Sequence, residues 1–401
     1  MLFRSPSCSS VVARGDRKLE DHGKVAAIVQ GTSSFYLGQT GRFRDHPFEI
    51  IGHIQYQHPA GGRWDEWYVA FAGGRWCWLA EAQGKRYLTQ ERKISSGLQL
   101  PRWQDLQLGM TINLKKEVPF QVTEFATATV VGGEGELPFD LRPDKPHAFV
   151  DLTGPDNDFA TIQYDDEPVA MFTGKEVTLD DLGISESDRA DAEPIPIAAK
   201  GLSCPQCSGA LDLRAPEAER VICPYCSSVL DVNEGNLVYL RTLEQKKFKP
   251  WLQLGSEGEL RGTRYTVLGV LCRAVRFDRS YSWEEYLLYN PKVGFRWLVH
   301  SDRHWSFVEP VTVNRFDKPG SIAKAVTHQG LKYQLFQRAW ARVIYVLGEF
   351  YWKVSLGDTV LAEDFIAPPR MISFELTPET KPDNAARAAD RKSTRLNSSH
   401  T

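Results

Sequence analysis

The chain has 401 residues, of which 42% are hydrophobic and 25% charged, and its formal net charge at pH 7 is -3. This length allows two or three domains with cores of their own, and the composition excludes collagen, a long coiled coil and a disordered chain. No apolar run approaches the ~18 residues of a membrane-spanning helix, and the charge gives no electrostatic reason to expect nucleic acid as a partner.

The two ends of the chain differ in origin from the rest. MLFRS at residues 1–5 and DRKSTRLNSSH at residues 390–400 match translations of the two ends of a common short-read sequencing adapter. We therefore interpret residues 1–5 and 390–401 as an adapter artefact and exclude them from the prediction of the fold. The natural sequence between them would then be cut at both ends.

The remaining chain repeats itself, which indicates its architecture. The series Gly38, Gly41, Phe48, Gly52 recurs as Gly255, Gly258, Tyr265, Gly269, and the run 64–67 recurs at 283–286. We predict a tandem duplication of a cysteine module followed by a larger domain. The expected parts are a remnant of a first zinc ribbon with its linker (6–29), a first β domain (30–186), a linker (187–200), a zinc ribbon (201–234), a second β domain (235–376) and a truncated tail (377–389).

Each large copy is predicted to be mainly β. Short runs rich in β-branched and aromatic residues alternate with Gly, Asp and Pro, as at 48–54, 66–71 and 75–79 and again at 265–270, 285–289 and 295–300. Turns about 10 residues apart favour two tandem small barrel- or sandwich-like antiparallel domains. The better helix candidates are residues 19–29 and 322–328.

Four cysteines form the motif of highest specificity. Cys204 and Cys207 form one CxxC pair, and Cys223 and Cys226 form a second. This spacing predicts a four-thiolate zinc ribbon, in which one structural Zn²⁺ stabilises a module too small for a core of its own. A closed set of four thiolates leaves no position for a catalytic water, and it implies a reducing compartment.

The other cysteines have simpler explanations. Cys8 lies in a segment, PSCSSV, that is similar to the PYCSSV segment around Cys226, so we expect Cys8 to be the last ligand of a severed first zinc site. Cys77 and Cys272 stand alone in apolar runs, which favours buried, inert thiols. No set of residues typical of a catalytic site can be assembled from the sequence.

A repeated Trp-acid-Glu-aromatic run is the most distinctive feature of the large domain. Glu66 follows Trp64 in the first copy, and Glu285 follows Trp283 in the second. One interpretation is a ligand surface in which a carboxylate recognises a cation that rests on the Trp ring. The alternative is that the rings belong to the core and the carboxylate pairs locally.

Nucleic acid is a weaker candidate ligand, although many zinc ribbons bind it. Residues 201–231 contain more acidic than basic side chains, whereas phosphate binding requires Lys and Arg. We therefore expect no nucleic-acid partner.

Longer motifs resemble a bacterial family, the domain of unknown function 4178 (DUF4178). The similar strings include LGQTGRFRDHPFEIIGHI, WDEWYVAF and WLAEAQGKRYLT in the first copy, and GEFYWKVSLGDTVLAEDFIAPPRMIS in the second. The family has no established activity. The resemblance implies a ribbon-domain-ribbon-domain order, followed in longer members by membrane-spanning segments.

These observations predict a non-catalytic binding or scaffolding protein with structural zinc, located in the cytoplasm at the inner face of a bacterial membrane. Membrane contact would come only through a missing C-terminal segment. The partner would be an unidentified protein or a small cationic ligand. The alternative function is an enzyme or binding protein that acts on polyamine-like cations.

Overall fold

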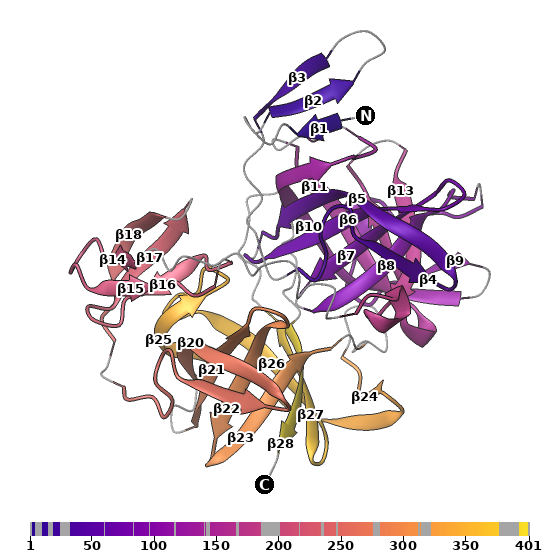
Figure 1. The fold of residues 1–401 in the computed structure, drawn as a ribbon. Coiled ribbons are helices and arrows are strands. Elements are labelled where there is room, and N and C mark those ends of the chain that lie inside the picture. The colour runs from indigo at the N-terminus through magenta and orange to yellow at the C-terminus, as the bar shows by residue number, and fades with distance from the viewer. Residues whose placement is uncertain are drawn as a thin grey trace. The chain divides into compact units, whose positions relative to one another are not determined.

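A computed structural model describes most of the chain as antiparallel β-structure (Figure 1). The described residues are 2–4, 10–14, 19–24, 33–185, 201–376 and 393–399, apart from gaps at 60, 83, 96, 116–117, 140, 142–144, 166–167, 216, 234–235, 246–247, 276–280, 312 and 314–321. Cys8, the linker 187–200 and the tail 377–389 lie outside them. The prediction of a mainly β fold is confirmed.

The first copy forms a closed ring of eight strands, because the first and last strands of the series also pair with each other. The ring follows the order β5 (His46–Gln57), β6 (Arg63–Phe71), β7 (Arg75–Ala82), β8 (Lys85–Glu91), β13 (Ala170–Glu176), β12 (Asp158–Gln163), β11 (His147–Thr153) and β10 (Val118–Gly135). β4 (Thr40–Phe43) and β9 (Thr111–Lys115) extend it, and single 3-10 turns lie at Trp103–Asp105, Pro155–Asn157 and Asp180–Leu182.

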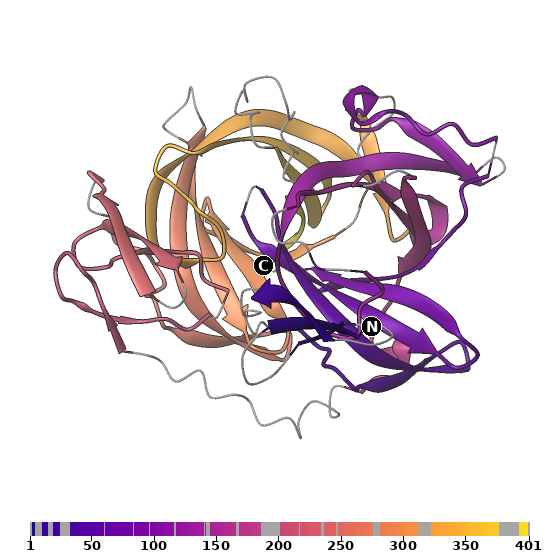
Figure 2. The same ribbon diagram turned by 90° about the horizontal axis from the view of Figure 1, so that it is seen from above.

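The second copy forms an equivalent ring. Its order is β20 (Thr263–Val275), β21 (Ser282–Asn290), β22 (Gly294–Ser301), β23 (His304–Pro310), β28 (Ser393–Ser399), β27 (Arg370–Leu376), β26 (Thr359–Ala367) and β25 (Leu331–Phe350), with β25 pairing back onto β20. β19 (Glu257–Leu260) and β24 (Ala325–His328) extend it. β28, described by its backbone only, falls within the residues that the sequence assigns to the adapter. The curved strands of both rings are visible in Figure 2.

Both rings close at a pair of glycines, which explains why these glycines recur in the sequence. Gly52 faces Gly135 across β5 and β10, and Gly269 faces Gly348 across β20 and β25. Gly135 and Gly348 have φ of 75° and 92°, in the left-handed region that favours glycine. A Cβ atom on Gly52 would also clash with the carbonyl oxygen of Glu136.

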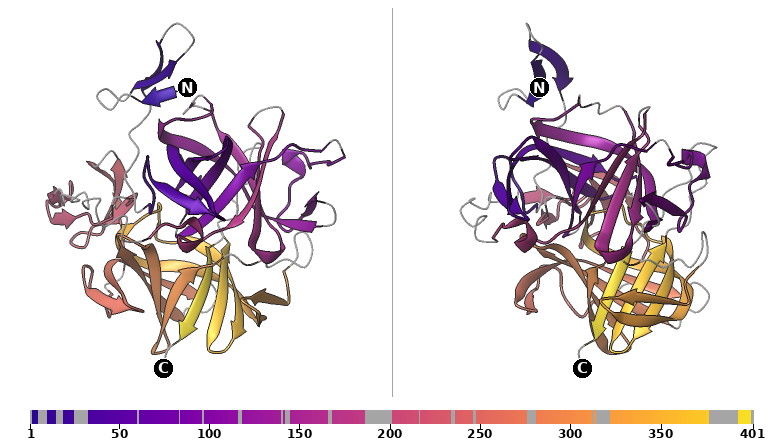
Figure 3. Two further views of the ribbon diagram at one scale, coloured as in Figure 1. Left: turned by 45° about the vertical axis from the view of Figure 1, so that its right-hand side comes forward. Right: turned by 90° about the vertical axis from the view of Figure 1, so that its right-hand side faces the viewer.

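The ribbon is a set of short strands attached to the second barrel. β14 (Gly201–Ser203) pairs with β15 (Ala210–Asp212), and β16 (Arg220–Ile222), β17 (Ser228–Asn233) and β18 (Asn236–Thr242) form a meander. β16 also pairs with the end of β25, which extends the sheet of the second barrel into the ribbon (Figure 3). The chain accordingly divides into two compact units, one with the first barrel and one with the ribbon and the second barrel.

Neither predicted helix is found in the described residues, and residues 25–29 of the first lie outside them. Residues 19–24 form β3 (Leu19–Lys24), which pairs with β2 (Ser10–Arg14), itself paired with β1 (Leu2–Arg4). At 322–328, β24 forms a hairpin with β25 through a turn in which Gln329 and Gly330 both have positive φ. A two-residue turn of this kind directs the chain back along itself, so the backbone hydrogen bonds join two strands. Among the described residues, no helix is long and apolar enough to cross a bilayer.

Candidate functional site

The four cysteines of the two CxxC pairs come together in the ribbon. Their sulfur atoms all lie within 4.8 Å of one another. The Sγ atoms of Cys204 and Cys226 are 3.7 Å apart, and those of Cys207 and Cys223 are 3.8 Å apart. These separations are too long for disulfides, but four sulfurs each about 2.3 Å from one zinc ion lie about 3.8 Å from each other. The geometry therefore fits a tetrahedral metal site.

The two halves of this site have the same backbone conformation. The N–H of Ser208 donates to the carbonyl of Cys204, and the N–H of Ser227 donates to the carbonyl of Cys223. Ser208 and Ser227 have φ of 58° and 59°, a conformation that L-residues adopt only when the surrounding structure requires it. The ribbon has few buried apolar residues of its own, among them Leu211. A metal ion would supply the stabilisation that so small a core lacks.

The repeated Trp-Glu pairs have the same local geometry in both barrels. Trp64 Nε1 donates to Glu66 Oε1 at 3.1 Å, and Trp283 Nε1 donates to Glu285 Oε1 at 2.7 Å. Residues two apart on a strand share one face of the sheet, so each carboxylate lies beside its own indole ring. The duplication thus preserves a hydrogen-bonded pair and not only a sequence motif.

In the first barrel, Glu66 lies among aromatic rings. The ring of Tyr56 stacks on Trp64 at 5.0 Å and on His147 at 4.7 Å, and Phe149 meets Trp64 edge-on at 5.4 Å. Burial raises the pKa of the Glu66 carboxyl, while the nearby charge of His147 and the hydrogen bond from Trp64 oppose that rise. Among the described residues, no Lys or Arg forms an ion pair with Glu66.

In the second barrel, Glu285 is paired with an arginine. Arg273 Nε lies 3.1 Å from Glu285, and both side chains are at least nine-tenths buried. Arg273 faces Trp283 across β20 and β21, just as Tyr56 faces Trp64 across β5 and β6. The two copies therefore differ at one equivalent position, which holds a phenol ring in the first barrel and a guanidinium in the second.

A second acidic residue accompanies the Glu in each barrel. Burial and the charge of Glu124 raise the pKa of Asp151 well above its ordinary value, and Glu66 adds a smaller contribution. Burial likewise raises the pKa of Asp364, to which Glu285 also contributes. The two aspartates occupy equivalent places on β11 and β26. Asp151 faces Thr161 on the next strand of its ring, and Asp364 faces Ser373 on the next strand of its own.

The two cysteines that the sequence shows as isolated, Cys77 and Cys272, both lie in barrel strands. Cys272 is buried, and burial raises its pKa far above the usual range for a thiol. Cys77 is only partly buried, and burial raises its pKa to about 11. Neither thiol is a strong nucleophile at neutral pH.

Comparison with known proteins identifies both copies. A family model for the domain of unknown function DUF4178 matches residues 36–179 and again residues 253–386. The chain belongs to this family. No curated protein and no solved structure matches it. Each DUF4178 match covers most of one barrel, and the four cysteines lie between the two matches.

The sequence alone did not reveal which residues surround the two glutamates. Asp151 and Asp364 were missed because a β-bulge in β10 and another in β25 set their register, and the flanking segments of the two DUF4178 copies differ in length. Arg273 could have been found, because extending the repeat from Gly52 and Gly269 aligns it with Tyr56.

Proposed function

We propose that this chain is a non-catalytic binding protein in which Zn²⁺ stabilises the ribbon and the first DUF4178 barrel binds a small cationic ligand at Glu66. The observation that carries this proposal is the Arg273–Glu285 pair of the second barrel. There the protein supplies its own cation beside the repeated Trp-Glu pair. In the first barrel the equivalent residue is Tyr56, and the charged group that acts on Glu66 is His147, so a cationic ligand would add the Arg-like charge that this carboxylate lacks.

The chemistry around Glu66 supports a cationic ligand of the amine or guanidinium class. Buried carboxylates are stable when a cation neutralises them, and the faces of Trp and Tyr rings attract cations. Glu66 in its ionised form supplies negative charge, and Trp64 and Tyr56 supply the rings. The rings are in contact with one another, so Trp64 or Tyr56 would shift when a ligand enters.

Such binding would compete with protons. Because the pKa of Glu66 is raised, a larger share of this carboxyl is protonated at mildly acidic pH than in an ordinary Glu. A bound cation favours the ionised form, so affinity should increase as the pH rises from 5.5 to 8. A ligand held by contacts with neutral groups alone would show no such trend.

Spermidine is a suitable probe for this proposal. Calorimetric titration at constant ionic strength should show binding to the wild type, and Glu66→Gln should weaken it at least tenfold. The matched control is Glu257→Gln, which removes an exposed carboxylate that lies 3.8 Å from Arg264. Equal affinity in the wild type and Glu66→Gln, or no binding at millimolar spermidine, would refute the cation site.

The metal has a separate test. Protein purified without chelator should contain one zinc ion per chain by elemental analysis, and Cys223→Ser should lose it. Copper, iron or no metal in the wild-type protein would contradict the assignment to zinc. This result is independent of the spermidine titration.

The charge of the ribbon remains unfavourable for nucleic acid. Arg220, one of the few basic residues of the ribbon, is buried and lies 2.6 Å from Asp231. The Asp231 carboxylate therefore neutralises the charge of Arg220. We expect no retention on heparin at low salt. Retention that Arg220→Gln leaves unchanged would point to another basic surface.

A further inference from the structure

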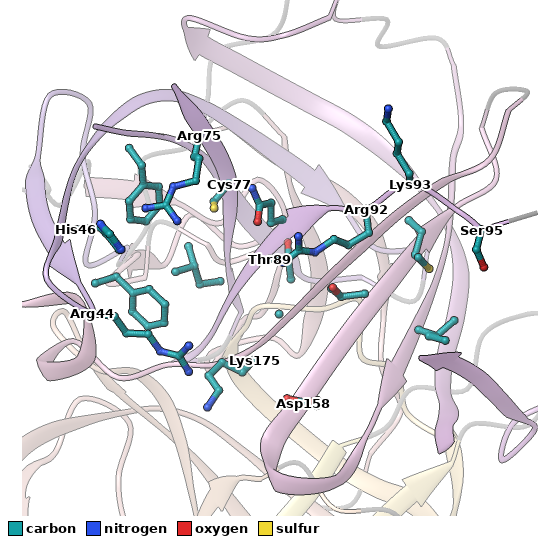
Figure 4. A pocket seen from close by; sticks show the side chains of 18 of the residues that line it. Arg44, His46, Arg75, Cys77, Thr89, Arg92, Lys93, Ser95, Asp158 and Lys175 are labelled. Carbon is teal, nitrogen blue, oxygen red and sulfur yellow. The ribbon is translucent and has the colours of Figure 1, made fainter. Parts of the chain in front are cut away.

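A pocket of about 680 Å³ in the first barrel suggests a second type of ligand. It lies beside β7, β8 and β13, next to the turn between β4 and β5 and the segment that follows β8 (Figure 4). This pocket is separate from Glu66, because none of the residues around that carboxylate lines it.

The polar part of the pocket lining is strongly basic. Arg44, Arg75, Arg92 and Lys175 contribute to it, together with Lys93, which extends away from the others in Figure 4. The charges of Arg75 and Arg92 both act on the Cys77 thiol in this pocket, opposing the effect of burial on its pKa. Asp158 is the one carboxylate that lines the pocket within the described part of the chain, and no ion pair is found there for these five cations.

Another part of the lining is apolar. It consists of side chains from both core clusters of the first barrel and from the segments that cover them: Phe43, Phe71, Cys77, Leu88, Leu98, Leu114 and Met171. The guanidinium groups of Arg44 and Arg75 lie over the rings of Phe43 and Phe71, at 5.3 and 6.0 Å. A ligand that fits this lining would combine a negative charge with an apolar body.

The second barrel carries a carboxylate of its own at the equivalent place, in an exposed ion pair. Arg261 corresponds to Arg44, and both have positive φ in the turn that precedes the first ring strand. Glu309 lies 2.8 Å from Arg261 and 4.0 Å from Arg296. Trp297 pairs with Val308, and the equivalent Trp78 pairs with Thr89. Glu309 and Gln90 are the next residues on those strands, so Glu309 corresponds to Gln90.

From this comparison we propose that the pocket of the first barrel binds an amphipathic anion, a single carboxylate or phosphate group on an apolar chain. Arg44, Arg75 and Arg92 hold the charged group, and Phe71, Leu88 and Met171 contact the chain. In the second barrel Glu309 takes the place of that charged group. This site does not depend on the cation site at Glu66.

Decanoate is the probe, since it remains monomeric at millimolar concentration. In calorimetric titrations decanoate should bind at least tenfold more tightly than either acetate, which lacks the chain, or 1-decanol, which lacks the charge; tenfold corresponds to about 1.4 kcal/mol. Decyl phosphate and vesicles that contain phosphatidylglycerol then distinguish a free ligand from a lipid headgroup. Binding of vesicles alone, without decanoate or decyl phosphate, would overturn the proposal of a single-chain anion.

Two variants test the residues. Arg75→Gln with Arg92→Gln should abolish decanoate binding, and Gln90→Glu should do the same by supplying the internal carboxylate of the second barrel. Arg264→Gln, an exposed arginine outside the pocket, is the matched control and should bind normally. Unchanged decanoate affinity in Gln90→Glu, or equal affinities for acetate and decanoate, would overturn the proposal.

A labelling experiment on the wild type avoids any effect of the variants on folding. Cys77 lines the pocket and is partly exposed, so N-ethylmaleimide should modify it slowly, and mass spectrometry resolves it from the other cysteines. Saturating decanoate should slow this modification severalfold, while 1-decanol at its solubility limit should not. A Cys77 rate that decanoate leaves unchanged would show that the anion does not enter this pocket.

Discussion

The two barrels close in the same way but balance their charges differently. In the second barrel, Arg273 lies beside Glu285, and Glu309 lies beside Arg261. In the first barrel the residues equivalent to Arg273 and Glu309 are Tyr56 and Gln90, which carry no charge. The second copy therefore pairs these charges with each other, whereas the first copy has no Lys or Arg paired with Glu66 and no carboxylate paired with Arg44 among the described residues. After duplication, the two copies can keep the same strand order while their charged groups diverge.

The second barrel also differs in its attachment to the ribbon. Glu349 accepts hydrogen bonds from the backbone N–H groups of Arg214 and Ala215, at 2.9 and 3.2 Å. Glu136, at the equivalent place after the closing glycine of the first barrel, is only partly buried. The ribbon and the second barrel should therefore unfold together, while the first barrel remains independent.

Removal of the metal should have the largest effect and should separate the two units. Structural zinc contributes on the order of 10 kcal/mol to the folding of such modules at neutral pH. A chelator, or Cys223→Ser, should unfold the ribbon and expose the end of β25, which pairs with β16. Hydrogen exchange followed by mass spectrometry should show faster exchange in residues 201–242 and 345–350 and unchanged exchange in the first barrel. Uniform protection after chelation would refute a structural role.

Breaking the internal ion pair should have the next largest effect. Arg273→Met leaves Glu285 buried without its cation, which costs about 3–5 kcal/mol for pairs of this kind. The double variant with Glu285→Gln should recover part of that loss, because it removes one of the two carboxylates that Arg273 pairs with; the other, Glu375, lies 3.3 Å from Arg273 and remains. Tyr56→Phe at the equivalent position should change stability by less than about 1 kcal/mol. Hydrogen exchange of β20 and β21 measures the change in stability for Arg273→Met and for the double variant. Hydrogen exchange of β5 and β6 measures it for Tyr56→Phe.

The contact between ribbon and barrel should depend on pH. Burial raises the pKa of Glu349 from 4.5 to about 7, and the hydrogen bonds from Arg214 and Ala215 only partly oppose this. Because the folded state holds the proton more tightly than the unfolded state, the free energy of unfolding should fall as the pH rises from about 4.5 to about 7. The shift corresponds to about 3 kcal/mol.

Glu349→Gln removes this titration and provides the control. Its stability should be independent of pH over that window, apart from the contributions of other groups, and should exceed that of the wild type at pH 8. Denaturant unfolding at several pH values, monitored in the second unit, measures the difference. A wild type that becomes more stable between pH 5 and 7 in this unit would contradict the assignment.

Sequence reasoning succeeded where chemistry is local and failed where it depends on strand register. The spacing of Cys204, Cys207, Cys223 and Cys226 was enough to predict that the four thiols converge, because each CxxC turn positions two sulfurs by itself. Two tandem antiparallel β domains followed from the repeat together with β-rich runs, and the structure decides between the barrel and the sandwich that the sequence left open. The prediction of a helix at 322–328 was wrong because the pairing of β24 with β25 depends on a turn whose two positive φ angles are not evident from residue types.

The candidate sites show the same limit. The repeat identified Trp64, Glu66, Trp283 and Glu285, and the structure shows the same Trp-to-Glu hydrogen bond in both copies. The residues that contact these four lie on strands far away in the sequence. The repeat aligns equivalent residues of the two copies, but it does not predict which residues are in contact within one copy. Which charges are neutralised depends on these distant contacts, and only the folded chain reveals them.

The closing glycines provide the smallest and most direct test of the common architecture. A Cβ atom on Gly52 would meet the carbonyl of Glu136, and one on Gly269 would lie 2.6 Å from the carbonyl of Glu349. Backbone cannot move aside as a flexible side chain can, so Gly52→Ala and Gly269→Ala should each cost about 1–3 kcal/mol. The clash is closer at Gly52, and that variant should lose more. Gly258→Ala, which would meet no atom within 4 Å, should stay within about 0.5 kcal/mol of the wild type. If thermal unfolding shows equal stability for all three variants, the barrels do not close at these glycines. The alignment that makes Arg273 equivalent to Tyr56 is then no longer supported.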